Sequence, residues 1–307
     1  MATVVMVHGI AQQKRSAEEL QAAWIPALAC GVREAGHEDL ADKITVDNDS
    51  GIEARMAFYG DLFLAADAQG DGSRPEVDPE VQAVELDLAR AMLERATEVG
   101  GPRDQARASV ALAATAPEQV DAQGFRATIR PAVEALARIG WLADLGQAFG
   151  ERYVWQELRQ ASLYLTKPDM REAIQDRVNR ILTADTRLVI GHSLGSVVSY
   201  EALHRASVAT PHFVTMGSPL GLRGPVTRRL EQQPPAFPLS ALSWLNLADH
   251  DDLVAGEPDL AGIFGGASGG RVVHDYVVDN GKRPHDAKAY LGQRALAAAT
   301  AAALALT

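Results

Sequence analysis

Short apolar runs alternate with longer helical stretches along this chain of 307 residues, and this alternation limits the fold more than any other feature. Parallel strands that are buried on both faces appear as continuous apolar runs, and each needs a crossover that returns the chain to the same end of the sheet. The pattern therefore predicts an α/β fold with a mostly parallel sheet flanked by helices. The runs expected to form strands are 3–7, 43–46, 55–59, 187–190, 213–216, 242–247 and 272–278.

The segment of about residues 62–166 differs from the rest because helical patterns replace the strand patterns, at 80–98 and again at 125–137. From Trp141 onward it is rich in large apolar and aromatic residues. Strand patterns resume after it, so we interpret it as a helical insertion within a single domain of residues 1–307. Two roles stay open for these helices: they pack against the sheet, or they form a cap that covers a substrate.

The charge balance and the residue types exclude several classes of function. The chain has 29 basic and 40 acidic residues, a net charge of −11, so its surface repels nucleic-acid backbones and anionic lipid. A single cysteine, Cys30, allows no internal disulfide and no thiolate metal cluster, which suits a reducing compartment. No basic leader precedes the first apolar run and no apolar stretch has the length that a bilayer requires, so we expect a cytoplasmic protein without a transmembrane segment.

One peptide has the pattern of a serine nucleophile: 191–195 reads Gly-His-Ser-Leu-Gly, in the form G-x-S-x-G. The pattern alone is weak, and a second match occurs at 266–270. That second match follows a loop and precedes a strand, whereas the first follows the apolar run 187–190 and precedes an amphipathic helix. A nucleophile elbow requires a strand before the serine and a helix after it. We therefore expect Ser193 to be the nucleophile.

Steric constraints explain why this peptide has two glycines. A serine in a tight strand-to-helix turn has strained backbone angles, and side chains at Gly191 and Gly195 would collide with neighbouring backbone. The same turn places the amide of Leu194 at a helix N-terminus, where the helix dipole favours a developing oxyanion. We therefore expect this amide to be one donor of an oxyanion hole.

These residues identify a family resemblance. The segment 4–9 (Val-Val-Met-Val-His-Gly), the peptide 191–195, and the acid and histidine segments downstream resemble the α/β-hydrolase superfamily, particularly its lipase-like and esterase-like members. The resemblance does not extend to about residues 62–166. It implies the α/β-hydrolase fold. Many members carry two strands before the His-Gly strand, and this sequence starts at that strand, so the resemblance implies a sheet of about six or seven strands.

The resemblance also implies an order along the chain of serine, then acid, then histidine. Three histidines follow Ser193 in the sequence and have a loop with carboxylates nearby: His250, His274 and His285. His274 lies within an apolar strand pattern. His285 lies in a loop after the last strand, and loops at the carboxyl ends of parallel strands are where catalytic groups collect. That loop also resembles the loop that carries the histidine in the superfamily, so we expect His285 to be the base.

The acid is expected in the loop that follows the apolar run 242–247, which carries Asp249, Asp251 and Asp252. The family pattern places the acid just before a short apolar pair, commonly Pro-Val, and Leu253-Val254 matches it imperfectly. Asp252 is therefore the first choice. Asp249 and then Asp251 stay open as alternatives.

The expected chemistry is ester hydrolysis by a serine hydrolase through an acyl-enzyme intermediate. Ser193 attacks the ester carbonyl, His285 transfers the proton and Asp252 orients the imidazole. By resemblance, the amide of Ile10 joins that of Leu194 in the oxyanion hole. No metal and no organic cofactor is expected, and the large apolar residues of the insertion favour a small-molecule ester with an apolar or lipid-like acyl group. A thioesterase, a peptidase, an acyltransferase or a non-catalytic ligand receptor of the same fold stays open.

Overall fold

The computed structural model describes residues 2–45, 51–68, 78–115, 125–206, 211–265 and 270–304. The last residue of the strand predicted at 43–46 lies outside the described residues, and so does most of the second G-x-S-x-G match.

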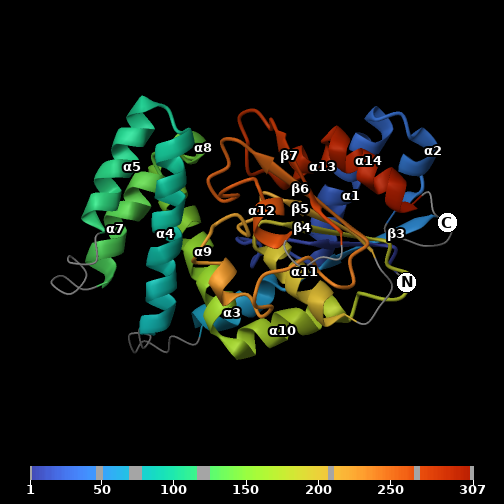
Figure 1. The fold of residues 1–307 in the computed structure, drawn as a ribbon, viewed down its shortest axis with the longest axis horizontal. Helices are drawn as coiled ribbons and strands as arrows, with labels where there is room; N and C mark the ends of the chain where they lie inside the picture. The colour runs from blue at the N-terminus through green and yellow to red at the C-terminus, as the bar shows by residue number, and fades with distance from the viewer. Residues whose placement is uncertain are drawn as a thin grey trace.

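The centre of the molecule is an open parallel sheet of six strands, in the order β3-β1-β4-β5-β6-β7 (Figure 1). A two-residue strand, β2, extends this sheet beside β3, and every neighbouring pair is parallel. The predicted α/β fold with a mostly parallel sheet is thus confirmed. The strands are β1 (Val4–Val7), β2 (Ile44–Thr45), β3 (Ile52–Ala57), β4 (Leu188–His192), β5 (His212–Met216), β6 (Ser243–Asp249) and β7 (Val273–Val278).

One predicted strand is displaced along the sequence. The expected run 55–59 forms β3 only as far as Ala57, and β3 begins earlier, at Ile52. Tyr59 leaves the sheet because its backbone amide and its hydroxyl both bind His8 at the end of β1. The start of β3 was missed because the charged Glu53, although buried in the sheet, interrupts the apolar pattern.

Helices cover both faces of the sheet. One face, with Val4 and Met6 of β1, packs against α1 (Ala17–Glu34), α13 (Ala287–Leu291) and α14 (Arg294–Leu304). The other face packs against helices that include α11 (Leu194–Arg205) and α9 (Gln147–Thr166). The central strands β1 and β4 are buried along their whole length, and their sequences are correspondingly almost entirely apolar, as parallel sheets require. The smaller elements are α2 (Glu38–Ala41), α12 (Ala261–Phe264) and the 3₁₀ helix η1 (Thr227–Arg229).

All chain between β3 and β4 that the structure describes is helical or connects helices. In Figure 1, α4, α5, α7 and α8 form a lobe to one side of the sheet, and α9 runs between this lobe and the sheet. The lobe and one sheet face share a continuous apolar core. Within the described residues, every helix is too short or too polar to cross a membrane. The helices of this stretch are α3 (Gly60–Ala68), α4 (Pro79–Val99), α5 (Pro102–Ala114), α7 (Phe125–Leu136), α8 (Gly140–Asp144), α9 and α10 (Pro168–Asn179).

Candidate active site

Ser193 lies in the sharp turn between β4 and α11, at the carboxyl end of the sheet. Its backbone φ of 53° and ψ of −132° lie in a region that non-glycine residues rarely adopt. A Cβ atom on Gly191 would lie 2.6 Å from the Cα of Ser196, and one on Gly195 would lie 2.2 Å from the carbonyl oxygen of Val7. The steric prediction for both glycines is therefore confirmed, and the turn stores strain at the serine.

The structure brings the predicted base and acid together. The Nδ1–H of His285 donates to Oδ2 of Asp252 at 2.7 Å, and both side chains are buried. Asp252 is held by two more donors: the Tyr290 hydroxyl, 2.9 Å from Oδ2, and the Val254 amide, 3.0 Å from Oδ1. Since all three groups donate to Asp252, the carboxylate is fixed and the proton of the imidazole is held on Nδ1. In the neutral imidazole, Nε2 of His285, at the opposite edge of the ring, therefore carries no proton.

The two alternative acids do not bind His285. Asp249 accepts the amides of Asp251 and Asn280, so its carboxylate fixes two loops to each other. Asp251 is exposed and pairs with the exposed His250. His274 is exposed on β7. Of the residues left open by the sequence, the structure therefore joins Asp252 to His285.

Electrostatics favour an ion pair between these two groups. Burial alone raises the pKa of Asp252, but the charge and the hydrogen bond of His285 outweigh it and leave the pKa below its usual range. Burial alone lowers the pKa of His285, yet the charge and the hydrogen bond of Asp252 leave that pKa above 6.5. Asp252 is therefore a carboxylate near neutral pH, and it stabilises a proton on the imidazole.

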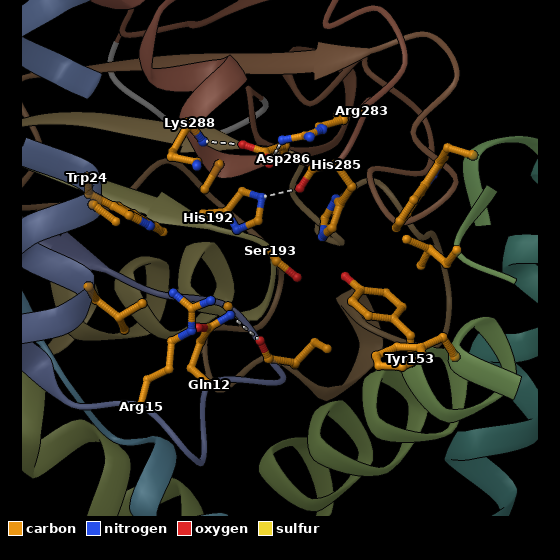
Figure 2. A pocket seen from close by; sticks show the side chains of 18 of the residues that line it. Gln12, Arg15, Trp24, Tyr153, His192, Ser193, Arg283, His285, Asp286 and Lys288 are labelled. Carbon is orange, nitrogen blue, oxygen red and sulfur yellow. Dashed lines mark hydrogen bonds and ion pairs between the residues drawn. The ribbon is translucent and has the colours of Figure 1, made fainter. Parts of the chain in front are cut away.

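The hydroxyl of Ser193 binds a residue that the sequence did not point to. It donates to Oε1 of Glu157 on α9 at 3.5 Å, a long hydrogen bond. Within the described chain, Nε2 of His285 is buried and has no hydrogen-bond partner. Figure 2 shows Ser193, His285 and Tyr153 turned toward the same space. Ser193 and His285 thus line the same cavity, with Asp252 bonded to Nδ1 of the imidazole, and the hydroxyl and the imidazole form no hydrogen bond with each other.

Glu157 is buried, and its burial raises the pKa of the carboxyl from 4.5 to about 7. The charge of His285 and the hydroxyl of Ser193 lower this pKa, whereas the charge of Asp252 raises it. The signal in the sequence was weak: Tyr153, Glu157 and Gln160 recur at helical spacing on a face that is otherwise apolar. Polar residues on a buried helix face need a partner, and Glu157 and Gln160 find theirs on other elements.

The loop after β1 also contacts α9. The amide of Ala11, whose φ is 60°, donates to Oε1 of Gln160 at 3.2 Å. Gly9 lies so close to the nucleophile that a Cβ atom on it would be 2.6 Å from the Cβ of Ser193. In the part of the chain that the structure describes, the amides of Ile10 and Leu194 donate no hydrogen bond. Both are therefore available as donors on either side of the serine.

Two buried histidines support the loops of the site. His192 Nε2 binds the carbonyl oxygen of His285 at 3.0 Å, and burial lowers the pKa of His192 to about 3. His8 Nδ1 binds the carbonyl oxygen of Gly9 at 2.6 Å, while its Nε2 accepts the amide of Tyr59 at 3.1 Å. Burial lowers the pKa of His8 to about 4. Both rings are therefore neutral near pH 7 and position backbone.

Comparisons of the chain with protein-family models, with curated proteins and with solved structures found no match. Among the described residues, no group of three or more His, Cys, Asp or Glu side chains is arranged to hold a metal ion.

A cavity of about 740 Å³ opens above Ser193 and His285 (Figure 2). The inserted helices form one apolar wall, in which the ring of Trp141 lies roughly parallel to that of His285, with 6.0 Å between ring centres. Four basic residues lie around the rest of the cavity. Apolar residues of the lining are Ile10, Leu20, Trp24, Trp141, Leu145, Phe149 and Tyr153, and the basic ones are Arg15, Lys282, Arg283 and Lys288.

Proposed function

We propose that this protein is a serine hydrolase of the α/β-hydrolase type that cleaves a carboxylic ester. Ser193 is the nucleophile, His285 the general base and Asp252 the acid that orients the base. One observation carries the proposal: the buried 2.7 Å pair of His285 and Asp252 faces a strained serine at the bottom of a cavity. Strain and a buried ion pair are both unfavourable to folding, and such features gather at functional sites.

The reaction begins when the Ser193 hydroxyl turns from Glu157 to Nε2 of His285. The imidazole removes the proton as Oγ attacks the ester carbonyl carbon, and Asp252 stabilises the imidazolium. The amides of Ile10 and Leu194 bind the oxyanion of the tetrahedral intermediate. The imidazolium then protonates the leaving alkoxide, which leaves an acyl group on Oγ. Water, deprotonated by His285, then attacks the carbonyl carbon of the acyl-enzyme. The carboxylic acid leaves, and the imidazolium returns a proton to Oγ, which restores the hydroxyl.

A fluorophosphonate probe tests the proposal. We expect rapid labelling of the wild-type protein, with the adduct mapped to Ser193 by peptide mass spectrometry and missing from Ser193→Ala. A panel of p-nitrophenyl esters then shows turnover. A folded wild-type protein that is neither labelled nor active on any ester would refute hydrolysis and favour a ligand-binding role.

The apolar wall of the cavity predicts the acyl group. Trp141, Leu145 and Phe149 come from the insertion and offer apolar area next to the serine. Each methylene that they bury contributes about 0.8 kcal/mol. We therefore expect kcat/KM to rise from acetyl through butyryl to octanoyl p-nitrophenyl esters, and Phe149→Ser to reduce the rise. A preference for acetyl would contradict an apolar acyl site.

A further inference from the structure

Glu157 is a buried carboxyl that the chemistry proposed above does not use. It lies on α9, and the Ser193 hydroxyl donates to its Oε1. Its Oε2 is buried without a hydrogen bond of good geometry, although the Tyr153 hydroxyl lies near enough to lower the pKa of the carboxyl, and among the described residues no lysine or arginine pairs with it. A buried carboxyl without a salt bridge destabilises the fold when it ionises. Its presence beside the nucleophile therefore calls for a functional reason.

We propose that Glu157 is a further catalytic residue of the hydrolase proposed above: its carboxylate orients the Ser193 hydroxyl and supplies a second counter-charge for the His285 imidazolium. The inference rests on the proposed function and deepens it, because it assigns a catalytic group to the inserted helix.

The geometry supports both roles. The hydroxyl of Ser193 has two possible acceptors in the site, Oε1 of Glu157 and the unpaired Nε2 of His285. Holding the hydroxyl on Glu157 keeps its proton within the site, so that a rotation about the Cα–Cβ bond of Ser193 brings it to the imidazole. Once Nε2 is protonated, two carboxylates act on the imidazolium: Asp252 is bonded to Nδ1, and Glu157 is close enough for its charge to raise the pKa of the ring.

The charges around Glu157 determine whether it stabilises or destabilises the His285 imidazolium. The charge of Glu157 raises the pKa of His285, and the charge of His285 in turn lowers the pKa of Glu157. An anion near the imidazolium stabilises it, and the effect is strong where water is excluded. The groups that act on the pKa of Glu157 are Ser193, Asp252 and His285, from three other places in the fold, and Tyr153 on the same helix. The charge of Glu157 in turn raises the pKa of the buried Tyr59.

The test is Glu157→Gln, which keeps the shape and removes the charge. We expect kcat for a p-nitrophenyl ester to fall about tenfold while KM changes little, since one buried charge interaction is lost in the transition state. The acid limb of the pH–rate profile, which reports deprotonation of His285, should lie above pH 6.5 in the wild type and move to lower pH in the variant. Glu157→Asp keeps a carboxylate and should restore part of the rate.

Stability separates this role from a structural one. The pKa of Glu157 is about 7 in the folded protein against 4.5 normally, so the wild type loses stability as pH rises through this window. Glu157→Gln should remove that loss and be more stable than the wild type at about pH 8, although it is slower. The control variant is Glu201→Gln. Glu201 is another buried glutamate, which lies in the second half of α11 and binds Tyr164 and Arg171. This variant should leave the acid limb of the pH–rate profile in place.

Three results would overturn the inference. The first is a Glu157→Gln variant with unchanged kcat and an unshifted acid limb. The second is a faster variant, since the carboxyl would then hold Ser193 away from His285. The third is an imidazole pKa of His285, followed by NMR, that is equal in wild type and variant; this measurement needs no substrate. If the wild type is not labelled by the fluorophosphonate, the proposed hydrolysis itself fails, whatever the NMR result.

Discussion

Asp252→Asn is expected to slow ester hydrolysis by about 10⁴ while the protein stays folded. The Asp252 carboxylate only accepts hydrogen bonds, and it accepts them from His285, Tyr290 and Val254. An asparagine amide group must place its NH₂ against one of them. If the NH₂ takes the place of Oδ1, it faces the amide of Val254 and that buried hydrogen bond is lost. If it takes the place of Oδ2, it faces both Tyr290 and His285; it then forces the imidazole proton from Nδ1 to Nε2, and the imidazole can no longer accept the Ser193 proton.

The measurement is kcat on the best ester of the panel, together with urea unfolding to show that the variant is folded. Asp251→Asn is the matched control, because Asp251 lies one position away in the same loop and is exposed. It should change kcat less than about twofold. If Asp252→Asn keeps more than about a tenth of the wild-type rate, the hydrogen bond between Asp252 and His285 does not support catalysis and the assignment of the acid is wrong.

Gly195→Ala is expected to destabilise the fold by about 3 kcal/mol or more. The added methyl group would lie 2.2 Å from the carbonyl oxygen of Val7 and 2.3 Å from that of His8. Both atoms belong to backbone at the end of β1, which is held between β3 and β4 and cannot move without breaking the sheet. Alanine favours a helix over glycine by about 1 kcal/mol, so propensity alone predicts the opposite sign.

Urea unfolding of the variant measures this loss. Gly101→Ala serves as the control, since Gly101 has an ordinary negative φ and a Cβ atom on it meets no atom within 4 Å. It should shift stability by less than about 1 kcal/mol. Equal unfolding midpoints for Gly195→Ala and wild type would mean that α11 can move away from β1. The close packing inferred for the nucleophile turn would then be wrong.

The sequence allowed the sheet to be predicted because its inner strands β1, β4, β5 and β6 are buried and their apolar runs are bounded by turn residues. The turn at Ser193 was recognisable because a side chain at Gly191 or Gly195 would collide with neighbouring backbone. His285 and Asp252 could be chosen because loops at the carboxyl ends of parallel strands converge, and because their order and flanking residues resemble those of the α/β-hydrolase superfamily. For the sheet and the turn, the deciding constraint acts over a few neighbouring residues or follows from the parallel arrangement.

The residues that were missed depend on packing between distant segments. Glu157 and Gln160 meet the nucleophile and the loop after β1 only because α9 lies along the sheet in one particular rotation. Tyr290 reaches Asp252 from α13, 38 residues further along the chain. Helical periodicity gives the polar and apolar faces of a helix, but it does not give the partner of either face. The rotation of α9 is fixed by its core residues, such as Leu158, against those of the sheet and the lobe.

The position of α9 limits how this protein can diversify. One helix forms part of the core of the lobe, supports the loop beside the nucleophile through Gln160, and holds the Ser193 hydroxyl through Glu157. For the proposed hydrolase, exchanging the lobe together with α9 would remove Glu157 and Gln160 along with the apolar wall of the cavity. Variants of that hydrolase selected for new substrates are therefore expected to carry their changes on α8 and the first turn of α9, and to leave the later turns intact.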